Sequence, residues 1–275
     1  MNEVQMIGTL VFIFGAIVGS FLNVCIVRLP DEKSVIRPRS HCIHCQKPIL
    51  WYDNIPLLSY LILKGRCRFC QKRISFRYFW VEFITALTFV GFYRYFGLSV
   101  LLIPYLVMVC GFIAATVIDF KHRIIPDEVS IGGILAGMIF SFFLPRLQGL
   151  EVPPQGFPIF IHLQSVGWSV AGVLVGGGVI YAMGLLGDFL FKKESMGGGD
   201  VKFLAMIGAF LGWKLAILTF FISPFFGAVF GIIEKVRKND SAIPYGPFLA
   251  LGALISLFWG EKLIAAILGG TWLMY

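Results

Sequence analysis

Long apolar runs separated by shorter polar segments dominate the pattern of hydrophobic and polar positions in this chain. The first run, residues 6–27, has no charged side chain and is long enough to cross a bilayer, which takes about 20 apolar residues. Residues 201–233 would be too long for one span, so the pattern favours a break at Trp213–Lys214. The sequence therefore predicts an all-α polytopic membrane protein of about eight transmembrane helices, at residues 6–27, 81–95, 99–118, 129–144, 166–191, 201–213, 215–233 and 246–267.

One polar segment, residues 28–80, is long enough to form a small domain outside the membrane. We therefore expect a first transmembrane helix at 1–27, a loop domain at 28–80 and a multi-helix membrane domain at 81–275. The first apolar run has no basic residue before it and is followed by Arg28, which is the wrong polarity for a cleaved signal peptide. We expect this helix to be retained, with its N-terminus outside.

Composition agrees with a membrane protein, because 58% of the residues are hydrophobic, 14% are charged and the mean hydropathy is +0.85. The net charge of +8 does not indicate a nucleic-acid partner, since basic residues in a membrane protein first report topology. With the N-terminus outside, the cytoplasmic side holds 19 of the 23 Lys and Arg residues, in segments 28–80, 119–128, 192–202 and 234–239. We expect membrane lipids and no nucleic acid as partners, and a homo-oligomer stays open.

Two pairs of cysteines with C-x-x-C spacing stand in the long polar segment: Cys42 with Cys45, and Cys67 with Cys70. Two such pairs at this separation match the ligand spacing of a structural zinc site, in which four thiolates complete a tetrahedron. The alternative is a pair of disulfides, but the segment is predicted to be cytoplasmic, where thiols stay reduced. The spacing favours a closed, non-catalytic Zn²⁺ site.

Two carboxylates mark helix ends on the same predicted face of the membrane. Asp119 closes the apolar run 99–118, and Asp200 follows the glycine triplet 197–199. An acid at the mouth of a membrane helix is costly to keep charged, so it usually has a task. Two aspartates that share a site hold one proton between them, so one can activate water while the other protonates a leaving amine. The glycines have no Cβ and would let a peptide lie against Asp200, although a flexible turn is the simpler interpretation of the triplet alone.

Other features have structural interpretations. Asp127 follows Pro126 and precedes a predicted helix, which is the place for an N-cap. Gly172 and Gly176 have the spacing that is typical of close helix packing. Segment 145–165, rich in Pro and Gly, is predicted to be an outer loop, and we find no internal repeat.

The segment KESMGGGDVKFLA at 193–205, together with the stretch from Asp119 to Asp127, resembles the type IV prepilin peptidases, which are polytopic aspartyl proteases with a Gly-x-Gly-Asp motif. Ser195, where the family has glycine, and a long outer loop are departures that touch no catalytic position. The resemblance covers nearly the whole chain and includes the four cysteines and the motifs GSFLNV at 19–24, RLP at 28–30, WYDNIP at 51–56, GRC at 65–67 and IPYGPF at 243–248.

The resemblance implies a bifunctional enzyme of the bacterial cytoplasmic membrane. It would cleave the leader from prepilins and pseudopilins on the cytoplasmic side, with Asp119 and Asp200 as the catalytic dyad. It would then N-methylate the new amino terminus with S-adenosylmethionine. Motif support for the dyad comes from Gly197, Gly199 and Lys202.

The methyl-donor site is expected from the resemblance in the large cytoplasmic loop, with Gly65 and Arg66 as the candidate region. No glycine-rich nucleotide fingerprint on a strand–helix unit supports it independently. A peptidase without methyltransferase activity, with the loop as a lid or docking surface, is therefore one alternative. A proton- or cation-coupled transporter is another, but it would place its acids near mid-span, whereas Asp119 and Asp200 lie at predicted helix ends.

Overall fold

A computed structural model describes residues 3–153, 158–192, 196–238 and 244–267. In this part of the chain there are helices and two isolated β-bridges but no strands, which confirms the all-α prediction. Residues 193–195 and Ile243, at the edges of two of the motifs, lie outside the described residues. The chain divides into two compact units, Met1–Ala114 and Ala115–Tyr275.

Several helices are long and apolar enough to cross a membrane, which confirms a polytopic protein. Among the described residues there are five such segments: Val4–Asp31, Leu102–His122, Ile159–Leu190, Gly198–Ile233 and Gly246–Ile267. The shorter helices over 77–96 and 127–143 are not among them, so the count of eight spans stays a prediction.

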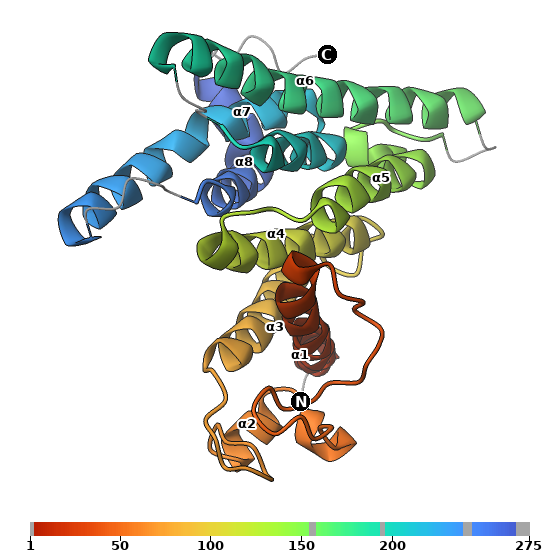
Figure 1. The fold of residues 1–275 in the computed structure, drawn as a ribbon. Helices are drawn as coiled ribbons and strands as arrows, with labels where there is room; N and C mark the ends of the chain where they lie inside the picture. The colour runs from red at the N-terminus through yellow and green to blue at the C-terminus, as the bar shows by residue number, and fades with distance from the viewer. Residues whose placement is uncertain (1–2, 154–157, 193–195, 239–243, 268–275) are drawn as a thin grey trace. The chain divides into compact units, whose positions relative to one another are not determined.

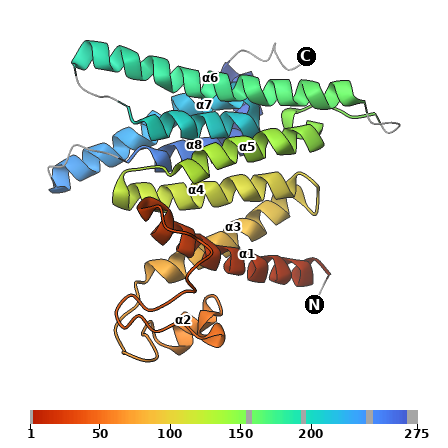
Figure 2. The same ribbon diagram turned by 45° about the vertical axis from the view of Figure 1, so that its right-hand side comes forward.

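Unit 1 is built on two packed helices, α1 (Glu3–Arg28) and α3 (Arg77–Phe96), which lie side by side in Figures 1 and 2. Two glycines of α1 permit this approach: a Cβ on Gly15 would lie 2.8 Å from the Cα of Ala86, and a Cβ on Gly19 would lie 2.7 Å from the Cα of Glu82. The long polar segment connects the two helices and carries the short elements η1 (Leu29–Asp31), η2 (Trp51–Asn54) and α2 (Leu58–Ile62). The first part of α4 (Leu102–His122) completes this unit.

Unit 2 contains the end of α4 and a set of helices in which α6 (Ile159–Phe191) lies along α7 (Gly198–Lys238), as Figures 1 and 2 show. Gly172 and Gly176 of α6 face the backbone of α7 at Gly208 and Leu204, which confirms the close packing predicted for them. The first half of α7 forms the core, with Phe203 and Phe210 fully buried. The elements are α5 (Asp127–Phe143), η3 (Pro145–Gln148), α6 (Ile159–Phe191), α7 (Gly198–Lys238) and α8 (Gly246–Ile267).

Two element boundaries differ from those predicted from the sequence: the break in α7 and the end of the loop that follows η3. Helix α7 is interrupted at Gly212, where φ is 76° and ψ is 170°, one residue before the expected break. Glycine allows this positive φ without strain. The expected outer loop at 145–165 is too long, because α6 already begins at Ile159, and His162 is buried with its Nδ1 2.6 Å from the carbonyl of Phe142. The Pro- and Gly-rich composition therefore marks only the first part of that segment as irregular.

Candidate active site and metal centre

Asp119 lies near the end of α4 and is buried, with 5% of its surface exposed. Its Oδ2 accepts the backbone N–H of Gly246, the first residue of α8, at 2.9 Å. A helix N-terminus offers unpaired N–H groups and a positive dipole end, so it stabilises a carboxylate. The N-terminus of α8 therefore positions Asp119.

Asp200 lies in the first turn of α7, and its own N–H donates to the carbonyl of Gly197 at 3.1 Å. The rest of that turn leads into the buried core of unit 2, which fixes the position of the carboxylate. Gly199, which precedes Asp200, and Gly246, whose N–H is bonded to Asp119, both pack against Ile125. Unit 2 thus brings together the two aspartates that the sequence paired, from helices far apart in the chain.

Glycines at this site make room for Ile125. A Cβ on Gly199 would lie 3.4 Å from the Cβ of Ile125, and a Cβ on Gly246 would lie 3.1 Å from its Cδ1 and 2.9 Å from Asp119 Oδ2. A Cβ on Gly198 would meet nothing within 4 Å. The triplet is therefore close-packed at Gly199, whereas Gly198, two residues before Asp200, has open space beside it.

Tyr245 is a residue of this site that the sequence reasoning did not single out. Its hydroxyl is buried and has no hydrogen-bond partner among the described residues. Burial, and then the nearby charge of Asp200, raise the pKa of Tyr245, so the phenol stays protonated. The motif at 243–248 contained the signal, because a tyrosine between two prolines just before a helix is well placed to face the helix end.

Asp127 does not have the role expected from the sequence. Pro126 occupies the N-cap position of α5 and no side chain caps this helix, so the N-cap prediction for Asp127 is wrong. The Asp127 carboxylate instead pairs with the Nζ of Lys202 at 2.7 and 2.9 Å, which ties the first turns of α5 and α7 together. Lys202 is thus occupied at an exposed ion pair.

In unit 1 the four cysteines of the long polar segment converge. All their Sγ atoms lie within 4.8 Å of one another, and none of the chain's six cysteines, all within the described residues, forms a disulfide. A tetrahedral zinc site with Zn–S bonds of about 2.3 Å has sulfurs about 3.8 Å apart. The Sγ atoms of Cys42 and Cys70 are 3.8 Å apart, and those of Cys45 and Cys67 are 4.0 Å apart. The cluster therefore has the dimensions needed to hold a metal ion.

The thiols of this cluster differ in acidity. Although burial opposes it, the backbone N–H groups of Cys45 and His44 and the neighbouring thiols lower the pKa of Cys42 to about 7. At Cys70 the backbone N–H of Lys72 lowers the pKa, but burial and hydrogen bonds with the other thiols outweigh it and raise the pKa to about 11. A metal ion bound to the cluster would favour the loss of the thiol protons.

The two cysteine pairs are copies of one backbone motif, so the expectation of no internal repeat is wrong for this segment. Both have the sequence C-x-x-C-Q-K, at 42–47 and 67–72. In each knuckle the first cysteine's N–H donates to the lysine carbonyl at 3.0 Å, its carbonyl accepts the glutamine N–H at 2.9 Å, and the glutamine has a φ of 58°. A repeat this short escapes a search for periodic folds.

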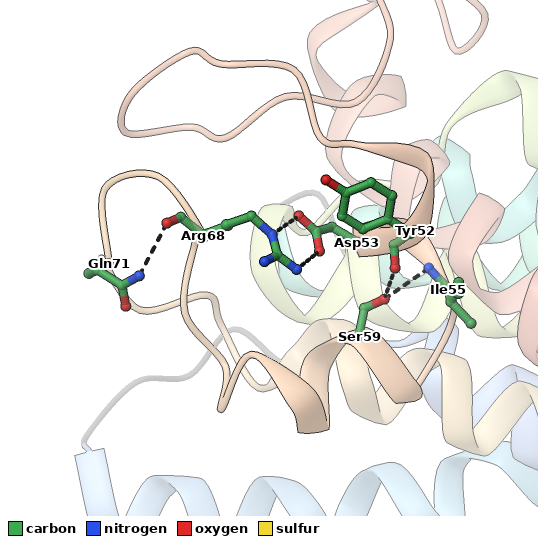
Figure 3. Close-up of polar contacts among 6 residues, drawn as sticks. All are labelled: Tyr52, Asp53, Ile55, Ser59, Arg68 and Gln71. Carbon is green, nitrogen blue, oxygen red and sulfur yellow. Dashed lines mark hydrogen bonds and ion pairs between the residues drawn. The ribbon is translucent and has the colours of Figure 1, made fainter.

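The second knuckle is tied to the element η2 (Figure 3). Arg68 donates from Nε and Nη2 to the two oxygens of Asp53, at 2.7 and 2.6 Å, and lies 5.4 Å from the ring centroid of Tyr52. Ser59 donates to the Tyr52 carbonyl at 2.9 Å and accepts from the N–H of Ile55 at 3.1 Å. Hydrogen bonds from Arg68 lower the pKa of Asp53. Polar contacts therefore join the knuckle to the rest of the segment.

Unit 1 also contains a cavity of about 260 Å³ between this segment and the helices α1 and α3. Arg66, Tyr60 and Tyr78 are among its lining residues. Gly65 adjoins it with a φ of +64°, and a Cβ there would lie 2.7 Å from the Tyr60 hydroxyl. The structure thus places the Gly65 and Arg66 region against a cavity that has aromatic and cationic walls.

Two family models match the chain. Residues 13–96 match the bacterial peptidase A24 N-terminal domain, and residues 106–232 match the type IV leader peptidase family. A Pseudomonas putida protein named prepilin leader peptidase/N-methyltransferase is 33% identical, over 94% of this chain and 92% of that protein. The chain belongs to the type IV leader peptidase family.

Two further relatives of this chain carry the same name as the Pseudomonas putida protein. An Aeromonas salmonicida protein is 35% identical over 93% of this chain and 91% of its own length. A Myxococcus xanthus protein is 39% identical over 81% of this chain, but the match spans only 61% of that longer protein. No solved structure matches the chain.

Proposed function

We propose that this chain cleaves the leader peptide of type IV prepilins and pseudopilins at the cytoplasmic face of the bacterial inner membrane, and then N-methylates the new amino terminus with S-adenosylmethionine. The observation that carries the proposal is that Asp119 and Asp200 lie at helix ends within one unit, where Ile125 packs against both Gly199 and Gly246. The names of relatives that match over nearly their whole length support the substrate and both activities.

Cleavage follows from the different surroundings of the two aspartates. Asp119 accepts an N–H from the start of α8, which favours its carboxylate form, so we assign it as the base and Asp200 as the acid. Asp119 takes a proton from water, and the resulting hydroxide forms a C–O bond to the scissile carbonyl carbon. When the C–N bond breaks, Asp200 gives its proton to the leaving amine. Gly198, which has open space beside it, would let the peptide backbone approach.

Replacing either aspartate tests this assignment. Asp119→Asn and Asp200→Asn should each reduce cleavage of a purified prepilin by about 100- to 10,000-fold, because each removes one half of the proton transfer and preserves side-chain shape. Asp127→Asn is the matched control and should keep nearly full activity. Near-normal cleavage by either variant of the pair would exclude the dyad, and loss on Asp127→Asn alone would move the role to that residue.

We further propose that the four cysteines hold one structural Zn²⁺ and that the N-terminus lies outside. The inter-sulfur distances support the metal, and the distribution of Lys and Arg supports the orientation. This orientation places the long polar segment in the cytoplasm, where its thiols stay reduced. With eight spans, α7 would cross twice, on either side of its break at Gly212.

The cavity of unit 1 is our candidate for the methylation site. Arg66 offers a cation for the methyl donor's carboxylate, and Tyr60 and Tyr78 offer rings for its adenine. Asn23 also lines this cavity, and its buried Oδ1 has no donor among the described residues, as expected near a site built for a polar ligand. S-adenosylmethionine would supply a methyl group activated on sulfur.

Gly65→Val should therefore reduce methylation by about tenfold or more and leave cleavage nearly unchanged. A Cβ at this position would collide with Tyr60, and the positive φ is strained for a β-branched residue. Incubation of the variant with prepilin and labelled S-adenosylmethionine, followed by comparison of cleaved and methylated product, measures both rates. Full methylation of the cleaved product would exclude this wall of the cavity from the reaction.

A further inference from the structure

Asn23 has an unusual position in the cavity of unit 1. The residue lies on α1 with 3% of its surface exposed, and its Nδ2 donates to the carbonyl of Tyr78 at 2.9 Å. This bond determines which end of the amide is oxygen. The oxygen has no donor among the described residues, and it belongs to a side chain that lines the cavity. A buried acceptor without a donor is costly, so it indicates a ligand that donates a hydrogen bond.

Glu82 of α3 lines the same cavity. Its Oε2 accepts the N–H of Leu57 at 2.8 Å, and the Ser20 hydroxyl is a second partner, but a carboxylate offers about four acceptor positions. No Lys, Arg or His among the described residues forms an ion pair with it. Arg66 and other basic residues line the cavity as well, but Glu82 places a negative charge and Asn23 an unsatisfied oxygen in its wall. Both residues belong to packed helices.

This combination fits one chemical group best. A primary ammonium has three N–H donors, a positive charge and no acceptor, so it satisfies both the amide oxygen and the carboxylate. A sulfonium has the charge but no N–H, and would leave Oδ1 of Asn23 unsatisfied. We propose that Asn23 and Glu82 form a primary-ammonium subsite in this cavity. The proposal rests on the methylation proposed above, in which both reactants carry such a group: the freed amino terminus and the amino acid portion of the methyl donor.

A structural role for Glu82 is the competing explanation, because its bond to Leu57 helps to hold the polar segment on α3. Glu82→Gln separates the two roles. The glutamine oxygen can still accept the Leu57 N–H, but the negative charge is gone. Asn23→Leu is a second variant, which removes the unsatisfied oxygen and keeps the side-chain volume.

Binding measured by calorimetry on the full chain in detergent micelles tests the proposal. The probes are a synthetic peptide with the mature N-terminal sequence of a prepilin, its N-acetylated form and S-adenosylhomocysteine. We expect wild type to prefer the free peptide over the acetylated one. Glu82→Gln should lower the affinity for the free peptide roughly 10- to 100-fold and leave the affinity for the acetylated peptide unchanged, so that the preference disappears. Asn23→Leu should reduce the same preference.

Asp31→Asn is the matched control, because Asp31 is exposed, pairs with Lys33 at 2.7 Å and does not line the cavity. It removes the same charge from unit 1 and should change no affinity. If Glu82→Gln weakens the binding of S-adenosylhomocysteine and not that of the peptide, the subsite stands and holds the methyl donor's amino group. Equal weakening of the free and acetylated peptides, or no change in any probe, overturns the proposal. If the wild type methylates the peptide and Glu82→Gln methylates it equally well, only this subsite is overturned. If the wild type neither binds a probe nor methylates the peptide, the proposed methyltransferase activity is overturned as well.

Discussion

The long polar segment of unit 1 and the helices of unit 2 are held together by different means. Residues 28–80 bury only Cys42, Ser59, Gly65 and Cys67, and their order comes from a cysteine cluster, turns and ion pairs. Unit 2 instead buries a continuous row of large apolar side chains on α7 and brings glycines into backbone contact with a neighbouring helix.

The difference decides which kind of change each region tolerates. A segment that buries so few side chains gains little from the hydrophobic effect, so its folded state depends on ligation and polar contacts. Helices whose backbones touch have no space for an added atom, but their surface charges matter little. We therefore expect the long polar segment of unit 1 to respond to the loss of a metal, and the helices of unit 2 to respond to the gain of a single methyl group.

Removal of the metal should have the largest effect. Structural zinc contributes on the order of 10 kcal/mol to the folding of small domains, so chelation or Cys42→Ser should unfold residues 28–80. Limited proteolysis should then cut within this segment, while α6 and α7 stay protected. Elemental analysis should find one zinc ion per chain in the wild type. Purified protein without zinc, and with its four thiols oxidised in cells, would refute both the metal and the cytoplasmic placement.

A methyl group on α6 should have the next largest effect. A Cβ on Gly176 would lie 2.6 Å from the carbonyl oxygen of Leu204, whereas a Cβ on Gly178 would meet nothing within 4 Å. Gly176→Ala should lower the free energy of unfolding by about 1–3 kcal/mol, because α6 and α7 must separate. Gly178→Ala should raise it by up to about 1 kcal/mol, since alanine favours a helix. Unfolding of both variants in mixed micelles measures the two signs, and equal effects would contradict the packing argument.

What could be predicted from the sequence was encoded locally. Apolar runs gave the helices, and the length limit of a membrane span placed a break one residue from Gly212. C-x-x-C spacing brought the cysteines together correctly, because each pair lies on one tight turn. The duplicated C-x-x-C-Q-K sequence was equally local, and a comparison of the two knuckles would have revealed it.

What could not be predicted depends on partners that are distant in the chain. Asp119 is bonded by the N–H of Gly246, and Asp127 is paired with Lys202. In both cases a local rule gave only a helix boundary, and the packing of unit 2 selected the actual partner. The cavity beside α1 and α3 has the same origin, because Asn23 and Glu82 lie on different helices and meet only in the folded unit.

The ion pair between Arg68 and Asp53 should have the smallest effect, although it has good geometry. The side chain of Asp53 is 7% exposed, but that of Arg68 is 44% exposed and therefore screened by water and salt. A double-mutant cycle with Arg68→Gln and Asp53→Asn, on the metal-bound protein, should give a small coupling energy, well below the loss caused by chelation. The hydrogen bonds from Arg68 lower the pKa of Asp53, so its folded-state pKa lies below the unfolded value of about 3.9. The contribution is thus fully present above the unfolded pKa and is lost only as the pH falls through the lowered folded value. The coupling should stay constant between about pH 6 and 8 and decrease as salt is added. A coupling that exceeds the loss from chelation, or that changes across this neutral range, would show that ion pairs rather than the metal hold the polar segment of unit 1.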